Sequence, residues 1–362
     1  MSTDKYTKID KSRACLILGA LGDALGAPVE FMKYDEIVAK YGDTPNTVKG
    51  VQMLDDAYGK KGAVTDDTQM SLFLADGLIS AFKRGAERGI LGEYWGYTAM
   101  SYIKWLETQG QNNPNYSDLT WGSQELFELV KAQGQRGPGN TCVSSLKAMK
   151  KPAEPAQNDS KGCGTVMRAA PIGIFFGNLI KDTGKDELQK VYDEGVHDAA
   201  ITHGHETAQH ASGLLAVIVA LALHGVALEK AIRIALDDFG TQDVSELCEK
   251  AVQMANESPS VENLRKLGQG WVAEEALAIA IYCSVLGAKR ILPVDDTLRL
   301  AVNHDGHSDS TGAITGNLLG IKLGTKEIPQ SLFGTNTEVG SMVEFLRKYG
   351  EDLIEVADYQ QS

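Results

Sequence analysis

The stretch Gly62-Ala-Val-Thr65-Asp66-Asp67-Thr68-Gln-Met-Ser71 places two neighbouring carboxylates between two threonine hydroxyls, and an apolar run follows at once. Threonine and aspartate are favoured at helix N-termini, where the helix dipole favours negative charge, so the stretch predicts a helix that runs from Asp67 to about Phe82. One such side chain is enough for a cap, however, and adjacent aspartates repel each other unless a cation lies between them. Because hard divalent cations take oxygen ligands of this type, the stretch predicts one half of a metal site.

A second stretch of similar composition lies near the other end of the chain, at Val302-Asn-His304-Asp305-Gly306-His307-Ser308-Asp309-Ser310-Thr311-Gly-Ala313. Asp309 and Ser310 stand at the predicted start of a helix rich in small apolar residues, as Thr65 to Asp67 do in the first stretch. Capping alone would explain either cluster. Two such clusters in one chain favour a metal site that they share.

Helical periodicity dominates the remaining sequence, and no alternation of β-branched residues requires a sheet. We therefore predict a single all-α domain over residues 1–362, a compact multi-helix bundle with orthogonal packing. Residues 41–61 are expected to form a loop and residues 150–161 an exposed connection. The predicted helices include 11–26, 91–106, 142–149, 187–202, 206–223, 228–236, 243–254, 273–286, 294–302 and 310–319, and a further one starts near Ser123.

The first predicted helix carries small residues at Gly19, Gly22 and Gly26. Close packing against another helix is the favoured interpretation. The alternative is that the small residues let a ligand approach Asp23 and Glu30.

Composition narrows the function classes. The chain has 362 residues and a formal net charge of -13, which argues against binding to nucleic acid because phosphates repel an acidic surface. Five scattered cysteines without a C-x-x-C pair indicate reduced thiols. The N-terminus lacks the apolar segment of a signal peptide, and the richest apolar run, Leu214 to Leu223, is too short to span a bilayer. We therefore expect a cytoplasmic protein that contacts neither nucleic acid nor membrane.

Six motifs occur in a characteristic order between about residues 13 and 322. They are Gly19-Ala-Leu-Gly-Asp-Ala-Leu-Gly-Ala-Pro-Val-Glu30-Phe31, Thr65-Asp-Asp-Thr-Gln69, Arg136-Gly-Pro-Gly-Asn140, Gly162-Cys-Gly-Thr-Val-Met-Arg168-Ala-Ala-Pro171, Ile201-Thr-His203-Gly-His205 and Gly306-His-Ser-Asp-Ser-Thr-Gly-Ala-Ile314. In these motifs the chain resembles the ADP-ribosylglycohydrolase family, the group that contains dinitrogenase reductase-activating glycohydrolase and ADP-ribosylarginine hydrolase.

The resemblance implies an all-α fold with a central cleft that holds two divalent metal ions, Mg²⁺ or alternatively Mn²⁺. It implies metal ligands at Thr65, Asp66 and Asp67 on one side of the cleft and at Asp309 and Ser310 on the other. Glu30 corresponds to a glutamate beside the metals, and either Glu30 or Asp66 is expected to act in catalysis as the general base.

The resemblance also assigns a ligand-binding segment. It implies that the glycine-rich segment holds the diphosphate of ADP-ribose and that His203 lies near a ribose. Glycines suit this task, because they let backbone N–H groups approach a phosphate. The segment consists of Gly162, Cys163, Gly164, Thr165, Val166, Met167 and Arg168.

One position departs from the family pattern. The late motif of the family reads Gly-Asp-x-Asp-[Ser/Thr], and His307 stands where its first aspartate, a metal ligand, is expected. Asp305 lies two residues earlier and is not that position. Imidazole suits zinc, manganese or nickel better than magnesium, so His307 retains a metal with altered preference, weakens one metal site or abolishes it.

The function implied by the resemblance is hydrolysis of the N-glycosidic bond between ADP-ribose and an arginine side chain of a modified protein. Such an enzyme would reverse mono-ADP-ribosylation, either in regulation or as an antidote to an ADP-ribosylating toxin. A catalytically weak or inactive protein that binds ADP-ribose, the modified target or the transferase is the alternative that His307 raises. Serine-linked ADP-ribose, O-acetyl-ADP-ribose and poly-ADP-ribose are alternative substrates.

Overall fold

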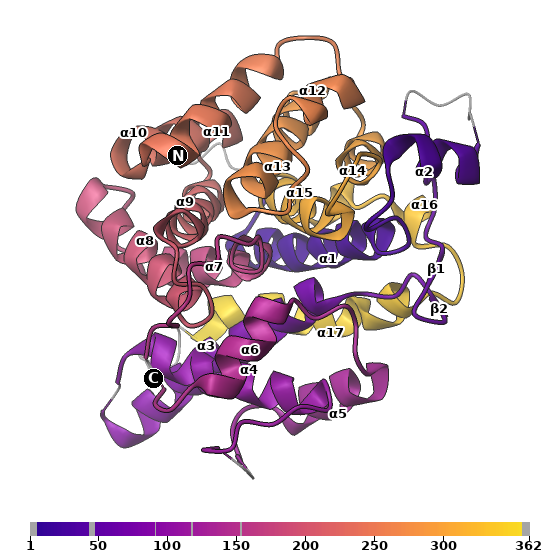
Figure 1. The fold of residues 1–362 in the computed structure, drawn as a ribbon. Coiled ribbons are helices and arrows are strands. Elements are labelled where there is room, and N and C mark those ends of the chain that lie inside the picture. Colours follow the sequence, from indigo (N-terminus) through magenta and orange to yellow (C-terminus); the bar gives the residue numbers. More distant parts are fainter. Residues whose placement is uncertain (1–5, 43–47, 91, 117–118, 153, 357–362) are drawn as a thin grey trace.

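The computed structural model describes residues 6–42, 48–90, 92–116, 119–152 and 154–356 (Figure 1). The α-helices in these ranges are α1 (Lys8–Gly26), α2 (Tyr34–Tyr41), α3 (Asp66–Arg88), α4 (Tyr94–Thr108), α5 (Gln124–Gln133), α6 (Asn140–Ala148), α7 (Ala170–Leu179), α8 (Lys185–Ala200), α9 (Glu206–Leu223), α10 (Leu228–Phe239), α11 (Gln242–Met254), α12 (Val261–Arg265), α13 (Ala273–Ala288), α14 (Val294–Val302), α15 (Ser308–Leu323), α16 (Gln330–Phe333) and α17 (Glu338–Glu355). Two 3₁₀ turns, η1 (Val166–Arg168) and η2 (Thr325–Glu327), and two short strands, β1 (Asp56–Ala57) and β2 (Lys60–Lys61), complete them.

The predicted all-α class is confirmed, since the described ranges hold seventeen α-helices and one hairpin whose two strands have two residues each. Sequence periodicity missed α2, α12, α16 and α17. The expected loop 41–61 contains the hairpin, whose central residues Tyr58 and Gly59 both have positive φ, as a tight turn of this kind requires. The helix expected from residue 91 begins at Tyr94, and Leu91 itself lies outside the described residues.

Helices α1 and α15 pack closely along each other at the centre of the molecule (Figure 1). Glycines make the approach possible. A Cβ on Gly22 would lie 2.0 Å from the carbonyl oxygen of Gly312, and one on Gly26 would lie 2.4 Å from that of Ser308. The favoured interpretation of the small residues, close helix packing, is therefore confirmed. This contact sets the start of α15 against the end of α1.

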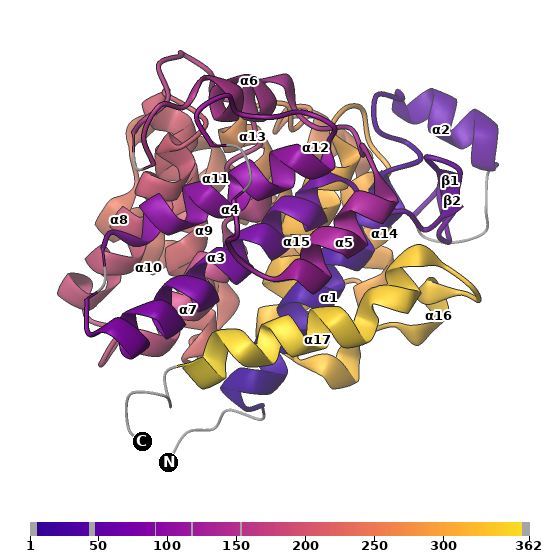
Figure 2. The same ribbon diagram turned by 90° about the horizontal axis from the view of Figure 1, so that it is seen from below.

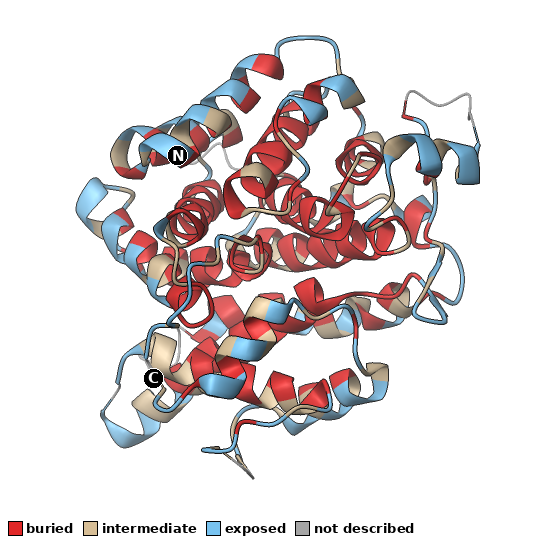
Figure 3. Ribbon diagram, in the orientation of Figure 1, coloured by how far each residue is buried: buried red, intermediate tan, exposed pale blue. Residues whose placement is uncertain are grey.

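The other helices surround this pair. In Figure 1, α9 to α14 lie above α1 and α8 lies at the left, whereas α3 to α6 and α17 lie below α1. Figure 2 shows α17 crossing the lower face. Figure 3 shows that α1, α9, α13 and α15 are buried over most of their surface. Buried hydrophobic residues form one connected cluster that extends from Ala14 to Val356.

Helix α9 corrects one expectation about membranes. Its 18 residues, Glu206–Leu223, are long and apolar enough to cross a bilayer by length and composition, with a mean hydropathy of 1.4. The expectation that the chain contains no such stretch is therefore wrong. However, 83% of this helix is buried inside the protein, as expected of a core helix that is apolar all round.

Candidate metal centre

The start of α3 is attached to α1 through Asp23. This fully buried carboxylate accepts hydrogen bonds from the backbone N–H and hydroxyl of Thr65, at 3.0 and 2.8 Å, and from the backbone N–H and hydroxyl of Thr68. Thr65 also caps α3, since its hydroxyl accepts a hydrogen bond from the N–H of Asp67. A hydroxyl has two acceptor sites, so Thr65 keeps one for a further contact.

The two aspartates at the start of α3 differ in their partners. Asp66 accepts a hydrogen bond of 3.3 Å from the backbone N–H of Gly139, and its own N–H donates to the carbonyl of Arg136. Asp67 is buried, and neither of its carboxylate oxygens has a hydrogen-bond partner in the described part of the chain. The motif that contains Arg136 and Gly139 therefore lies against the predicted metal ligands.

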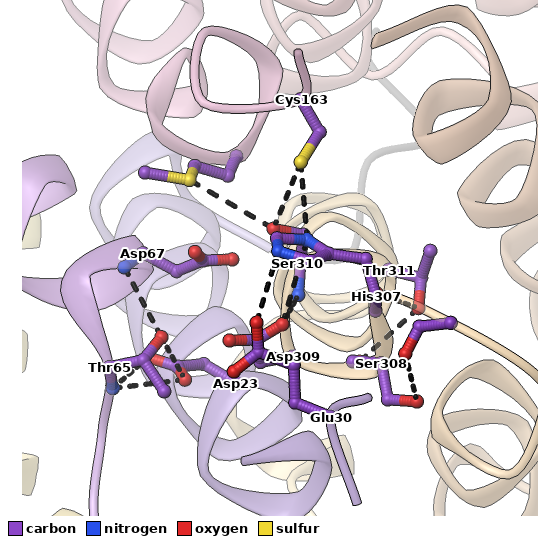
Figure 4. A network of polar contacts seen from close by, with 12 residues as sticks. Asp23, Glu30, Thr65, Asp67, Cys163, His307, Ser308, Asp309, Ser310 and Thr311 are labelled. Carbon is purple, nitrogen blue, oxygen red and sulfur yellow. Dashed lines mark hydrogen bonds and ion pairs between the residues drawn. The ribbon is translucent and has the colours of Figure 1, made fainter. Parts of the chain in front are cut away.

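The start of α15 supplies the opposing side chains. His307 precedes the helix, and its Nε2 lies 3.2 Å from Glu30 Oε1. Its Nδ1 lies 3.1 Å from the Sγ of Cys163 and 3.7 Å from Asp309 Oδ1. Figure 4 shows Glu30, His307 and Asp309 converging at one point, with the carboxylate of Asp67 pointing toward them. Ligand atoms of Glu30, His307 and Asp309 all lie within 4.8 Å of one another, which is close enough for a shared cation.

Burial and the charge of Asp309 raise the pKa values of four acids in the cluster. Burial, followed by the charge of Asp309, raises the pKa of Glu30 and of Asp23 to about 7. The same two causes raise the pKa values of Asp66 and Asp67 well above their usual range. The cluster therefore concentrates negative charge that costs free energy unless protons or cations neutralise it.

His307 is the basic group inside this cluster. Burial alone would lower its pKa, but the neighbouring Cys163 and Asp309 outweigh burial and raise it well above its usual value. An imidazolium at this position partly neutralises the acids.

The side chains present fit a divalent cation. A buried carboxylate without a partner, such as Asp67, is costly, and a cation that it coordinates removes the cost. Asp66, Asp67, Asp309, Glu30 and the hydroxyl of Ser310 offer the oxygen ligands that magnesium and manganese prefer. His307 adds a nitrogen ligand that suits manganese better than magnesium.

The predicted diphosphate segment, Gly162 to Arg168, lies directly beside this cluster. Cys163 contacts His307, and its Sγ lies 3.7 Å from the hydroxyl of Ser310. Several backbone N–H groups of the segment already have acceptors within the protein. The N–H of Cys163 donates to the carbonyl of Trp271, and the N–H groups of Val166 and Met167 donate to the carbonyl of Cys163. The N–H of Gly162 also donates to the hydroxyl of Ser160, at 3.4 Å, so these four N–H groups already have acceptors within the protein.

Arg168 supports the segment from beneath. Its guanidinium is fully buried, lies 3.2 Å from Asp198 Oδ2 and donates to the carbonyl of Gly164 at 2.7 Å and to the hydroxyl of Thr202 at 3.0 Å. With these partners the guanidinium shapes the segment rather than facing the cleft. The Arg168 side chain is therefore not placed to contact a ligand in the cleft.

His203 packs against the glycines of the same segment. A Cβ on Gly164 would lie 3.0 Å from the Sγ of Cys142 and 3.1 Å from Cε1 of His203, so a larger residue there would require these side chains to shift. The Nδ1 of His203 lies 2.8 Å from the hydroxyl of Thr202. Burial and the nearby Arg168 lower the pKa of His203 to about 3, so the ring is neutral. The Nε2 of this ring faces Gly162 and would lie 3.3 Å from a Cβ placed on that glycine.

Several residues of the site escaped the sequence analysis. Tyr58, at the tip of the hairpin, lies with its hydroxyl next to Gly137 and Glu30, and Trp271 lies with its ring 4.7 Å from that of His307. Neither residue belongs to a recognisable motif, so no local signal marked it. Asp305 is placed elsewhere, as its sequence position indicated: it accepts a hydrogen bond from the N–H of Tyr34 and pairs with Arg265 at 2.7 Å.

A surface hollow of about 600 Å³ borders the site. It lies between α6 and the segment that leads to Gly162. Its lining residues include Asn140, Thr141, Ser144, Lys147, Asn158 and Ser160. Asn140, at one edge of the hollow, directly follows Gly139, whose N–H donates to Asp66.

Comparison with known proteins agrees with this geometry. The model of the ADP-ribosylglycohydrolase family matches residues 4–361. This chain belongs to the ADP-ribosylglycohydrolase family. Members of the family are hydrolases that act on ADP-ribosylated substrates and typically bind divalent metals.

Individual relatives are distant. The chain is 25% identical over 325 residues to ADP-ribosylarginine hydrolase Tri1 of Pseudomonas putida, covering 89% of this chain and 72% of that protein. It is 23% identical over 335 residues to the protein of the same name from Serratia proteamaculans, covering 89% and 74%. A solved structure described as an ADP-ribosylglycohydrolase-related protein complex has the same fold, with a TM-score of 0.64, 22% identity and coverage of 97% of this chain and 99% of that one.

The structure thus brings most of the predicted site residues to one place. Glu30, Asp66, Asp67, His307 and Asp309 interact electrostatically, and Ser310 and Cys163 adjoin them. Their individual roles as ligands or catalysts stay predictions.

Proposed function

We propose that this member of the family hydrolyses the N-glycosidic bond between ADP-ribose and an arginine side chain of a modified protein. The convergence of two acidic helix N-termini beside the Gly162 segment carries this proposal, because the buried, unpartnered Asp67 calls for a cation at that point. Distant relatives named ADP-ribosylarginine hydrolase support arginine as the linkage.

Asp66, Asp67, Asp309 and Ser310 would hold two divalent ions, magnesium or manganese, with Thr65 and His307 as further ligands. Metal ions bound there would orient the vicinal ribose hydroxyls and lower the pKa of a bound water. All of these residues lie at the start of α3 or α15, so the ions would be held between two helices that face each other.

Glu30 is the favoured proton acceptor. Its carboxylate is largely buried, lies beside Asp309 and His307, and has a pKa of about 7, which suits a group that takes a proton at neutral pH. Asp66 is the alternative. Its hydrogen bond from Gly139 holds one oxygen in place, and its charge would stabilise the oxocarbenium-like transition state of glycoside cleavage. The departing guanidine needs a proton, which Glu30 would return after accepting it.

The remainder of ADP-ribose would occupy the neighbouring surface. The Gly162 segment would contact the diphosphate through its backbone, as glycine-rich segments at helix starts do. The adjoining hollow of about 600 Å³ falls within the size range of small-molecule sites. The neutral ring of His203, which packs against Gly162, would form a hydrogen bond with a ribose hydroxyl.

The test is release of free ADP-ribose from ADP-ribosyl-arginine in the presence of magnesium or manganese. We expect release from the arginine conjugate and little or none from ADP-ribosyl-serine or O-acetyl-ADP-ribose, assayed side by side. Turnover of the serine or acetyl conjugate alone would assign a different linkage to the same site.

A second candidate function is ADP-ribose binding with weak or no turnover. The contact of 3.2 Å between His307 and Glu30 favours it, since an imidazolium there neutralises the proposed base and competes with a metal ion. Retained ADP-ribose binding without release from any conjugate, with either metal, would support this function over hydrolysis.

We also propose that the protein acts in the cytoplasm. All five cysteines are free and buried, which suits a reducing compartment. Reversal of a regulatory modification and protection from an ADP-ribosylating toxin both fit such an activity.

A further inference from the structure

An exposed aromatic pair stands at the edge of the acidic cluster. Phe31 directly follows Glu30, is 70% exposed, and its ring stacks on that of Trp271 with centroids 5.3 Å apart and an interplanar angle of 25°. Trp271 in turn lies over His307, with ring centroids 4.7 Å apart. We call Phe31 and Trp271 the aromatic rim.

Burial in the core does not explain the position of Phe31. Its φ is +68°, a left-handed conformation that a bulky residue rarely adopts, and most of its ring faces solvent instead of the core. Strain of this kind persists where the surroundings enforce it, and it is concentrated at ligand sites. The turn that carries Glu30 into the cluster therefore also holds an aromatic side chain at its edge.

Trp271 is fixed to the ligand-binding segment. Its carbonyl accepts the N–H of Cys163, the neighbouring Val272 forms a bridge with Gly162, and its indole N–H donates to Gln269 Oε1 at 3.1 Å. The ring therefore has a defined place between the Gly162 segment and Phe31, and it remains partly exposed.

The chemistry of this edge selects a cation. The faces of aromatic rings carry negative potential and attract guanidinium groups more strongly when water is partly excluded. Two carboxylates of the cluster adjoin the rim: Glu30 directly precedes Phe31, and Asp309 lies 3.7 Å from His307, whose ring contacts that of Trp271. The flat faces also match a planar guanidinium better than an ammonium or a neutral hydroxyl.

We propose that the aromatic rim receives the guanidinium of the arginine from which ADP-ribose is released, and that it thereby sets the preference for arginine conjugates. This inference rests on the proposed function, because it names the leaving-group subsite of the same cleft. The rim residues are positioning residues: they hold the leaving group and take no part in proton transfer.

The test measures binding without turnover. The protein is saturated with ADP-ribose and magnesium or manganese, and methylguanidinium is titrated against methylurea, a neutral molecule of nearly the same shape, by ligand-observed NMR. We expect methylguanidinium to bind about tenfold more tightly than methylurea. Phe31→Ala should reduce this ratio to about one. Trp271→Phe, which keeps a ring, should retain most of it.

Equal binding of the two probes, or an unchanged ratio in Phe31→Ala, would overturn the rim as a guanidinium subsite. Because Phe31 is mostly exposed, its removal is not expected to unfold the protein, and the affinity for free ADP-ribose, measured on the same sample, should be unchanged. A parallel loss of ADP-ribose affinity would show general damage to the cleft and would count against the proposal.

Failure of the proposed function gives a different result. If the wild-type protein releases no ADP-ribose from the arginine conjugate but discriminates methylguanidinium from methylurea, hydrolysis is wrong and the rim stands. If it releases ADP-ribose and Phe31→Ala leaves the KM for the conjugate unchanged, hydrolysis stands and the rim is wrong.

Discussion

The starts of α3 and α15 use similar residues to different ends. At α3, Thr65 and Asp23 hold the backbone by hydrogen bonds, and Asp67 is left buried with no partner of its own in the described chain. At α15, His307 stands before Asp309 and contacts both Glu30 and Cys163. The start of α3 therefore requires a bound metal ion, whereas the start of α15 contains His307, which becomes a cation when it is protonated.

This difference shows how a charged cluster is kept stable inside a protein. Negative charge at a helix N-terminus is favoured by the dipole, but burial and the charge of Asp309 raise the pKa values of Asp66 and Asp67. Protonation of His307 or binding of a divalent ion relieves the same repulsion. The metal-binding properties of this protein should therefore depend on the competition between the two.

Removal of the unpartnered carboxylate should have the largest effect. We expect Asp67→Asn to lose metal and to reduce ADP-ribose release by a factor on the order of 10³, since a lost metal removes several kcal/mol of transition-state stabilisation. Metal content by mass spectrometry and initial rates check this. Asp35→Asn, an exposed acid in the first turn of α2, is the matched control and should keep both. Normal metal content in Asp67→Asn would reject it as a ligand.

Metal-free protein should lose stability as the pH rises. Glu30 has a pKa of about 7 in the folded protein against 4.5 for an ordinary glutamate, so between these values the native state binds more protons than the unfolded chain, and the free energy of unfolding decreases with rising pH. Each pKa unit is worth about 1.4 kcal/mol, so Glu30 alone should contribute about 2–3 kcal/mol to the loss from pH 5 to pH 8. Asp23, whose pKa is also raised to about 7, adds a loss of the same sign.

Thermal unfolding with a chelator across this pH range measures the effect. Added magnesium or manganese should restore the melting temperature most at pH 8, where the acids are ionised. The same increase on metal addition at pH 5 and pH 8 would mean that these acids do not bind the metal.

Replacement of His307 should shift the metal preference by a smaller amount. We expect His307→Asp to bind magnesium about tenfold more tightly, because it exchanges a nitrogen ligand for an oxygen ligand and removes a competing positive charge. Calorimetric titration with magnesium and manganese gives both affinities. His307→Asn, which lacks the added charge, serves as the comparison, and an unchanged magnesium affinity in His307→Asp would place this side chain outside the coordination sphere.

Loss of the cap on α3 should have the smallest effect. Thr65→Val removes the hydroxyl that contacts Asp23 and Asp67 and should lower the free energy of unfolding by about 1–2 kcal/mol. Thr65→Ser keeps the hydroxyl and should stay close to the wild type. Chemical denaturation of both variants decides this, and equal stability of Val and Ser at position 65 would contradict the capping role.

The sequence indicated more of the site than of its surroundings. The acidic clusters were visible because two neighbouring aspartates exceed what a helix cap needs, and α3 and α15 begin within two residues of the expected positions. Helix α2 was missed because its eight residues provide only about two turns of periodicity. Helix α17 was missed although its buried apolar residues recur at helical spacing, at Val339, Met342, Leu346, Tyr349 and Leu353.

Roles that depend on three-dimensional neighbours were not readable from the chain. Arg168 belongs to a motif associated with ligand binding, yet its guanidinium is paired with Asp198, 30 residues away. Cys163 contacts His307 across 144 residues, and Phe31 stacks on Trp271. No local sequence pattern marks such pairs, because the two partners lie in different elements that only the tertiary fold brings together.

The sequence by itself determined the helical class, the family and the two acidic helix starts, because periodicity, capping residues and ordered motifs are properties of local stretches. Only the tertiary structure decided that these starts face each other, that Asp67 is left without a partner while His307 has three, and that an aromatic pair borders the cleft. The physical reason is the backbone contact between α1 and α15 at Gly22 and Gly26, which sets Asp309 beside Glu30 although 279 positions separate them in the chain (309 − 30).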